Sequence, residues 1–115
     1  MSPRFVAGLV LVCALAACGG GLGSAKSAYR KGRLDEAKTE LASLEAESRA
    51  WPPSRRVEYA LYRGLVHLGL GDRAAAGVWL RETKAAEDAH PGTLEEDDRA
   101  RLRLALEALD SAAAP

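Results

Sequence analysis

The stretch YALYRGLVHLGLGDRAAA, residues 59–76, decides the fold, because it contains the end of one helix and the start of the next. Leu61 and Leu65 lie one helical turn apart, which is the spacing of an apolar helix face. Gly71 supplies the backbone freedom that a helix end requires, and Asp72 is a residue type that caps a following helix. The stretch therefore predicts two helices joined by a tight turn.

The first helix of this hairpin is apolar on more than one side. One stripe repeats at helical spacing and consists of Val57, Leu61, Gly64, Leu65 and Leu68. A second set lies off that stripe and consists of Tyr59, Tyr62 and Val66. A helix with several apolar sides is usually buried between neighbours. We therefore expect this helix at the centre of the fold, with Ser54 as its N-cap.

Helical patterns continue upstream, and no alternating strand pattern occurs from Ser24 onward. A short helix is expected over 24–31, and a second helix starts near Asp35. The apolar face of that second helix consists of Ala37, Leu41 and Leu44. The prolines of WPPS, residues 51–54, end this pattern because neither can continue a helix.

Downstream, the helix that follows Asp72 carries Ala75, Ala76, Trp79, Leu80 and Thr83. The segment HPGTLEED, 90–97, then breaks the pattern, and Thr93 with Glu96 fits a capping box for a last helix. The inward face of the last helix consists of Leu102, Ala105, Leu106 and Leu109. Its outer side is expected to carry the ion pairs Glu95–Arg99 and Asp97–Arg101.

The pattern as a whole predicts an all-α protein with one small domain. This helical domain spans 24–110, and the residues after it, 111–115, are expected to fray.

Two segments of this domain are alike when they are aligned on Gly32 and Gly71. They are AYRKGRLDEAKTELASL, 28–44, and HLGLGDRAAAGVWLRET, 67–83. In both, an alanine follows the glycine after five residues, and a leucine follows after four more. The glycine permits a left-handed turn, the alanine allows two helices to approach, and the leucine fills the gap. The domain therefore contains a repeated helical hairpin.

This pattern resembles the tetratricopeptide repeat. Gly64 lies seven residues before Gly71, where that family has a small residue in its first helix. The resemblance covers about 24–90 and implies a short α-solenoid of two helical-hairpin repeats, with the last helix as a C-terminal capping helix. The turn glycines are further apart than the family period of about 34 residues, which we attribute to a longer loop at WPPSR, 51–55. A five-helix bundle with similar hairpins stays open as the alternative, since stable stacks usually have about three repeats.

The N-terminus carries one positive charge at Arg4, followed by an almost wholly apolar run over 6–17. This run is shorter than the ~20 residues that a membrane-spanning helix needs. It is typical of the apolar region of a signal peptide. We therefore expect residues 1–17 to be an export signal.

The end of this signal, Leu15-Ala16-Ala17-Cys18, resembles the bacterial lipobox. The resemblance implies that Cys18 is diacylated and becomes the mature N-terminus, which anchors the protein in a membrane. In such lipoproteins an aspartate directly after the cysteine prevents transfer to the outer membrane. Gly19 stands at that position, so the resemblance implies transfer to the outer membrane, facing the periplasm. Residues 18–23 then form the lipidated cysteine and a glycine-rich tether. An ordinary secretory signal with a chance cysteine is the alternative.

Charge and cysteine content exclude several classes of function. The chain of 115 residues has 16 Lys+Arg and 16 Asp+Glu, so a basic nucleic-acid footprint is absent. Removal of 1–17 would leave Cys18 as the only cysteine. Disulfides, zinc–thiolate sites and thiol nucleophiles are then excluded from the mature domain.

No catalytic or metal-binding motif stands out from Ser24 onward. His67 is expected as a packed or solvated helix histidine, and His90 as a turn residue before a proline. The acids of EEDD, 95–98, are expected to be solvated, because consecutive helical carboxylates point about 100° apart and do not converge on one ion. We expect no enzyme activity, no cofactor and no metal.

The two tryptophans complete the candidate residues. Trp79 is expected to pack against the core. For Trp51 two roles stay open: packing against the core, or acting as an exposed anchor for a partner.

The expected function is protein interaction or assembly at the bacterial envelope. In tetratricopeptide proteins the first helix of each repeat lines a concave peptide-binding surface, and the resemblance implies seven residues there. They are Lys26, Tyr29, Arg30, Glu58, Leu61, Tyr62 and Leu65. Tyr29 and Leu65 would give apolar contact, while Arg30 and Glu58 would set the polarity of the bound segment.

Other classes stay open. The chain could be a structural accessory lipoprotein that binds through its last helix or whole surface. It could also self-associate through the exposed ends of a two-repeat stack. An enzyme or a small-ligand binder is the remaining class.

Overall fold

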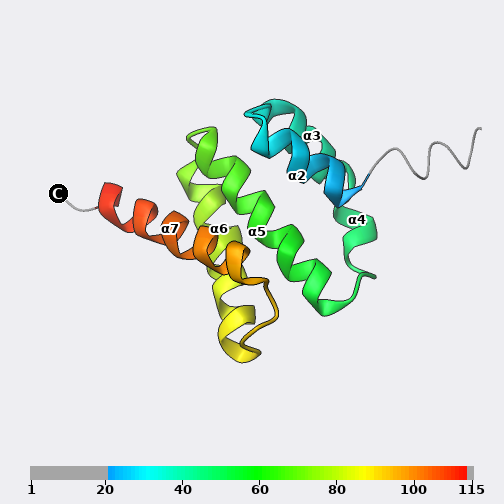
Figure 1. Ribbon diagram of the computed structural model, residues 1–115. Helices are drawn as coiled ribbons and strands as arrows, with labels where there is room; N and C mark the ends of the chain where they lie inside the picture. Colours follow the sequence, from blue (N-terminus) through cyan, green and yellow to red (C-terminus); the bar gives the residue numbers. More distant parts are fainter. Residues whose placement is uncertain (1–20, 114–115) are drawn as a thin grey trace, which may run out of the picture.

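The computed structural model describes residues 21–113, and its fold is all-α, as expected (Figure 1). Its helices are α2 (Leu22–Arg30), α3 (Leu34–Ser43), α4 (Glu45–Ser48), α5 (Pro53–Gly69), α6 (Arg73–Ala89) and α7 (Glu96–Ala113). No strand occurs among the described residues. The predicted signal, Cys18 and Gly19 lie outside this part of the chain.

Two helical hairpins, α2–α3 and α5–α6, are closed by the same turn. Gly32 and Gly71 have φ angles of 78° and 84°, in the left-handed region that favours glycine. In each turn the residue after the glycine donates its N–H to a carbonyl five residues earlier, at 2.9 Å. This is the hydrogen-bond pattern of a Schellman motif. The predicted turn glycines are therefore confirmed.

Helix α5 is the centre of the described part, as predicted, because it contacts each of the other five helices. In Figure 1 it lies between the α2–α3 hairpin on one side and α6 with α7 on the other. Its side chains Leu61, Tyr62 and Val66 are almost completely buried in one apolar core. The two apolar sides seen in the sequence thus correspond to packing against neighbours on several sides.

The crossing of α5 and α6 depends on Gly64. A Cβ atom at this position would lie 2.6 Å from Cγ and Cδ2 of Leu80, which is itself fully buried. Leu80 and Ala76 are the leucine and alanine of the second hairpin, and both are 0% exposed. Their counterparts in the first hairpin, Leu41 and Ala37, are also 0% exposed. Both copies of the sequence repeat therefore bury the same positions.

Two helices start earlier than predicted. Helix α2 begins at Leu22, so the last residues of the expected tether, 18–23, already belong to a helix. Helix α5 begins at Pro53, whereas Ser54 was expected as its cap. Proline suits the first helical position, where its missing N–H costs no hydrogen bond. The cap of α6 is confirmed, because Asp72 Oδ1 accepts a hydrogen bond from Ala75 N at 3.2 Å.

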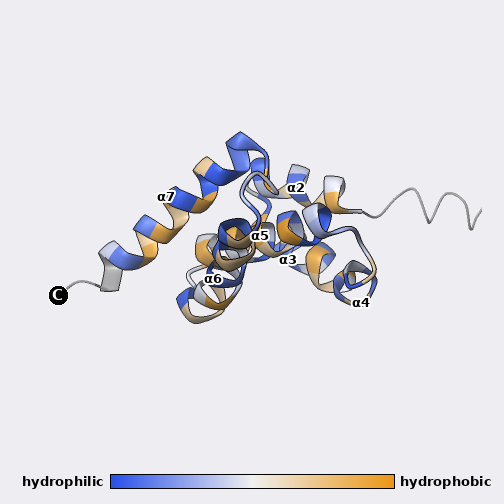
Figure 2. Cartoon of the chain, turned by 90° about the horizontal axis from the view of Figure 1, so that it is seen from below, coloured by the Kyte–Doolittle hydropathy of each residue, from blue (hydrophilic) through white to orange (hydrophobic). Residues whose placement is uncertain are grey.

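Helix α7 has the predicted inward face but not the predicted start. Leu102, Ala105 and Leu109 are buried, and Leu106 packs against the core. The expected capping box does not form, because the Thr93 hydroxyl donates to the carbonyl of His90 instead. The helix continues to Ala113, into the segment expected to fray. Figure 2 shows α7 at one edge of the domain, with its C-terminal end furthest from α3 and α4.

The partners of two arginines on α7 also differ from expectation. Instead of pairing with Glu95, Arg99 donates to the carbonyl of Leu94 at 3.1 Å. Arg101 pairs with Asp98 at 3.0 Å rather than with Asp97. Other local contacts, one to a carbonyl five residues earlier and one to an acid three residues earlier, thus replaced both i,i+4 pairs that helix spacing predicted.

Candidate functional site

The seven residues predicted to bind a partner lie on α2 and α5, but three of them are core residues. Leu61, Tyr62 and Leu65 are at most 5% exposed. The apolar contact expected from Leu65 is therefore not available at the surface. Lys26, Tyr29 and Glu58 are half-buried, and Arg30 is exposed. We call these four residues the α2–α5 face.

An ion pair and an aromatic pair join the two helices at this face. Lys26 Nζ lies 2.6 Å from Glu58 Oε2, and the two side chains are 19% and 25% exposed. The same ammonium group lies 5.4 Å from the centre of the Tyr62 ring. The Tyr29 and Tyr62 rings meet edge to face at 5.6 Å. The face is therefore filled by its own side chains rather than hollowed.

Helix α7 adds two polar residues beside this face that sequence reasoning missed. Tyr62 Oη donates to Asp98 Oδ1 at 2.9 Å, and Arg101 Nη1 pairs with the same oxygen at 3.0 Å. Burial, and next the hydrogen bond to Asp98, raise the pKa of Tyr62 to about 12. Asp98 is 4% exposed, which corrects the prediction that 95–98 are all solvated acids. The sequence did indicate that Asp98 is buried, since it lies one helical turn before Leu102 on the inward face of α7.

Both tryptophans belong to an aromatic cluster beside α4, α5 and α6. Tyr59 meets Trp51 and Trp79 edge to face, at 5.8 and 6.0 Å. The guanidinium group of Arg63 lies 4.8 Å from the centre of the Trp79 ring, and that of Arg55 lies 4.2 Å from the Trp51 ring. Both tryptophans pack against the core, which confirms the expectation for Trp79 and decides the open case of Trp51.

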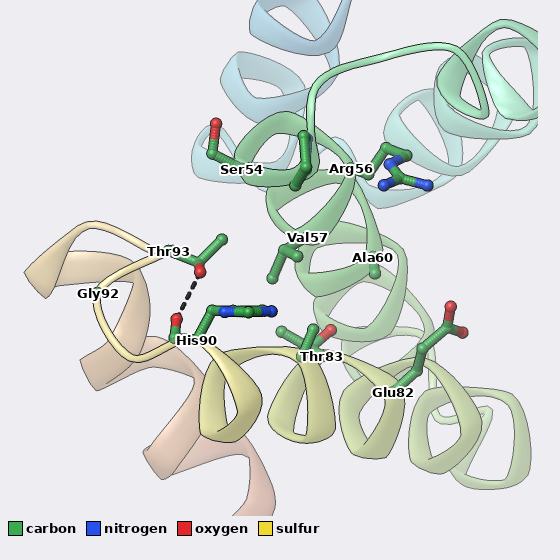
Figure 3. Close-up of a pocket in the computed structure, with 11 residues that line it drawn as sticks. Ser54, Arg56, Val57, Ala60, Glu82, Thr83, His90, Gly92 and Thr93 are labelled. Atoms are coloured by element: carbon green, nitrogen blue, oxygen red, sulfur yellow. Dashed lines mark hydrogen bonds between the residues drawn. The ribbon is translucent and has the colours of Figure 1, made fainter.

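A cavity beside α5 and α6 was not predicted. It is a hollow of about 750 Å³ between the first half of α5, the second half of α6 and the loop before α7. We call it the α5–α6 hollow. In Figure 3 Val57 and Ala60 face Thr83 and His90 across it, and Arg56 and Glu82 lie at one end. It is lined by Pro53, Ser54, Arg56, Val57, Ala60, Glu82, Thr83, Ala86, His90, Gly92 and Thr93.

A buried carboxylate holds the loop that closes this hollow. Glu87 Oε1 accepts from Leu94 N at 2.8 Å, and Oε2 accepts from Gly92 N at 2.6 Å. The bond from Leu94 N is the main cause that lowers the pKa of Glu87; burial opposes it, and the bond from Gly92 N adds to the lowering. The loop bends at Gly92, where φ is 89°. Glu87 thus fixes the position of the loop that carries His90.

A smaller hollow of about 250 Å³ continues from the first towards α4. The two share Arg56, Ala60 and Glu82 in their walls. The smaller one adds an aromatic wall from the tryptophan cluster and the charged residues Arg49 and Glu45. The two hollows are therefore neighbours, the first with mainly apolar walls and the second with aromatic and charged walls.

The two histidines differ in their surroundings. His67 is buried in α5, its Nδ1 atom has no hydrogen-bond partner among the described residues, and Asp72 Oδ2 lies 3.7 Å away. Burial, and next the charge of Arg63, lower the pKa of His67. His90 is exposed at the mouth of the α5–α6 hollow. Within 21–113, no three His, Cys, Asp or Glu side chains gather as a metal site would require.

Comparison with known proteins gives no relative: no family model, no curated protein and no solved structure matches the chain. Among the described helices, none has the length and apolarity needed to cross a bilayer.

Proposed function

We propose that this protein is a lipid-anchored lipoprotein of the bacterial envelope whose tetratricopeptide-like domain binds other envelope proteins. The observation that carries the proposal is the repeated hairpin. Both copies share one glycine turn and bury the alanine and leucine that follow it. Helix α3 packs on α5, and α6 packs on α7, so each hairpin is followed by a helix that covers it. Such stacking of hairpins is typical of helical-repeat interaction domains.

The anchor rests on the sequence at Cys18. The N-terminal sequence has the order that is typical of lipoproteins: an apolar run too short to span a membrane, then small residues, then a cysteine. Gly19 favours the outer membrane as the destination. The described domain begins at Leu22, only a few residues beyond the cysteine, so it would lie close to the membrane surface.

Cys18→Ser tests the anchor together with the adaptor function. The tagged chain is crosslinked in its own cells, purified from membranes and compared with the variant. We expect acylation of the native chain, and one envelope protein recovered with it in larger amount than with the variant. An unacylated chain that still fractionates with membranes would contradict the anchor. Recovery of only a second, differently tagged copy would favour the self-associating alternative.

The self-associating alternative is tested in the same experiment. Leu104 on α7 is 62% exposed, but a single exposed apolar residue is normal on a protein surface and carries no argument by itself. The same co-purification therefore includes the two-tag control.

The α2–α5 face is the first place to test for partner contact. Reversing Arg30 and Glu58 together, as Arg30→Glu with Glu58→Arg, is expected to reduce recovery of the partner severalfold. The exchange Lys26→Glu with Glu58→Lys keeps an ion pair between the helices but reverses its polarity, so it separates recognition from folding. Arg81→Glu, an exposed arginine on α6, is the matched control. Full recovery with both double variants would rule out this face.

A further inference from the structure

A buried histidine lies where the two helical hairpins meet. His67 is on the last turn of α5, and α3 of the first hairpin packs on this helix (Figure 1). The two helices approach closely there, since a Cβ atom at Gly69 would lie 2.9 Å from Cδ1 of Leu34, the first residue of α3. We call this contact between the start of α3 and the end of α5 the hairpin junction.

The imidazole ring of His67 is not fully paired in the folded domain. Its Nδ1 atom is buried and has no hydrogen-bond partner among the described residues, whereas most buried polar side-chain atoms have one. The side chain is 11% exposed, so protons from the solvent can reach the ring. His67 can therefore change its charge inside a packed contact.

The charged groups that act on this ring come from three places in the described chain. Arg63 lies one turn earlier on α5, Lys38 belongs to α3, and Asp72 belongs to the turn before α6. Asp72 Oδ2 is 3.7 Å from the Nδ1 atom, while its Oδ1 atom caps α6. A positive charge on His67 is therefore repelled by Lys38 across the hairpin junction and attracted by Asp72 within the second hairpin. Repulsion from Arg63 acts within one helix and does not separate the hairpins.

From this arrangement we propose that His67 makes the hairpin junction sensitive to acid. Near neutral pH the ring is uncharged and packs at the junction. When the pH falls, the ring takes up a proton, its charge repels Lys38, and the α2–α3 hairpin loosens from α5. The second hairpin keeps its own contacts, because its turn gains an ion pair between His67 and Asp72. The proposal does not depend on the lipid anchor or on the adaptor function.

The balance of these effects sets the sign of the pH dependence. Burial, and next the charge of Arg63, lower the pKa of His67; Asp72 opposes them and Lys38 adds to the lowering. The unfolded chain, in which the ordinary value of 6.5 holds, therefore binds the proton first as the pH falls. The contribution of His67 to stability is complete above about pH 6.5 and is lost as the pH falls through the lowered pKa.

Nuclear magnetic resonance of the full chain measures the titration of His67 directly. The chain has two histidines, so carbon-13 labelling of their rings gives two sets of signals, and His90→Gln identifies those of His67. We expect His67 to titrate at a lower pH than free histidine in the same tube. Lys38→Glu should move this titration to higher pH, because a carboxylate then faces the ring. Lys31→Glu, the same charge change at an exposed position after α2, is the matched control and should leave it unchanged.

Urea unfolding between about pH 5 and 7.5 measures the effect on stability. Relative to His67→Gln, we expect the unfolding equilibrium constant of the native chain to rise as the pH falls, by at most about tenfold per pH unit for one proton. His90→Gln should follow the native chain. Lys38→Glu should show a smaller rise than the native chain. Because Lys38 is exposed, this variant stays informative even if His67→Gln does not fold.

Amide hydrogen exchange locates the change within the domain. Protection factors, which correct for the intrinsic pH dependence of exchange, are compared at about pH 7 and about pH 5. We expect the protection of Ala37 and Leu41 on α3 to fall severalfold more than that of Leu80 and Thr83 on α6. Such a difference is the sign of a local opening at the hairpin junction.

The proposal is overturned by any of three results. These are titration of His67 at or above the pH at which free histidine titrates, the same pH dependence of stability in the native chain and in His67→Gln, or an equal loss of protection in α3 and α6. The last result would mean that acid unfolds the domain as a whole rather than at the hairpin junction.

Discussion

Replacing Gly64 with valine is expected to lower the free energy of unfolding by about 3 kcal/mol, the upper part of the usual range for overpacked cores. The new Cβ would lie 2.6 Å from Leu80 Cγ and Cδ2 and 3.3 Å from the Leu80 backbone nitrogen. Leu80 is fully buried, so it has no free space to turn into. Gly64→Ala is expected to be destabilising as well, because the gain of about 1 kcal/mol in helix propensity is smaller than the cost of the clash. Thermal and urea unfolding of the full chain measure both variants.

Two further variants make this prediction specific. Gly77→Ala on α6 is the matched control, since its Cβ would meet only the end of the Arg81 side chain, which can move. We expect it to be neutral or stabilising. Leu80→Ala should cost about 2–5 kcal/mol by itself, but less when it is combined with Gly64→Ala, because the clash is then relieved. A rise in melting temperature on Gly64→Ala, or strictly additive effects in the double variant, would contradict the packing argument.

Glu87→Ala is expected to destabilise the domain by about 3 kcal/mol, because the variant leaves two backbone N–H groups without their charged acceptor. One of them belongs to Leu94, which is 2% exposed, so water cannot easily replace the carboxylate there. Glu87→Gln should cost less, since its amide oxygen can still accept one of the two hydrogen bonds. Asp88→Ala is the control, as its partner Lys84 is exposed and such pairs contribute about 0–1 kcal/mol.

The same carboxylate predicts a pH dependence. The pKa of Glu87 is lowered from its ordinary value of 4.5, so its stabilising effect is fully present above about pH 5 and is lost as the pH falls through the lowered pKa. Urea unfolding across pH 3–6 should therefore show a smaller loss of stability for Glu87→Ala than for the native chain. Parallel curves would mean that Glu87 does not hold the loop through its charged form.

The sequence was most informative where the controlling interaction is local. Turn glycines, the Asp72 cap and the apolar stripes of α5 and α7 depend on residues within a turn or two of each other. They were therefore predictable from spacing. The all-α class follows from the same signals. The prediction of Ser54 as the N-cap of α5 was wrong for a local reason as well, since the adjacent Pro53 is better suited to the first helical position.

The candidate site was harder to predict because it depends on contacts between distant residues. Asp98 meets Tyr62 across 36 positions of sequence, and Glu87 meets a loop whose path no periodicity encodes. The α5–α6 hollow exists because two helices and that loop leave space between them, which no single segment signals. The resemblance placed Leu61 and Leu65 on an open surface, whereas the core of this short domain buries them.

The order of packing along the chain has a consequence for how the protein reaches its folded state. Each helix packs mainly against the next helix or the one after it, so few contacts close long loops. Chains with such low contact order fold quickly. A polypeptide that emerges N-terminus first can complete the α2–α3 hairpin, and then the α5–α6 hairpin upon it, before α7 appears. Until α7 docks, Tyr62 lacks the acceptor that Asp98 provides.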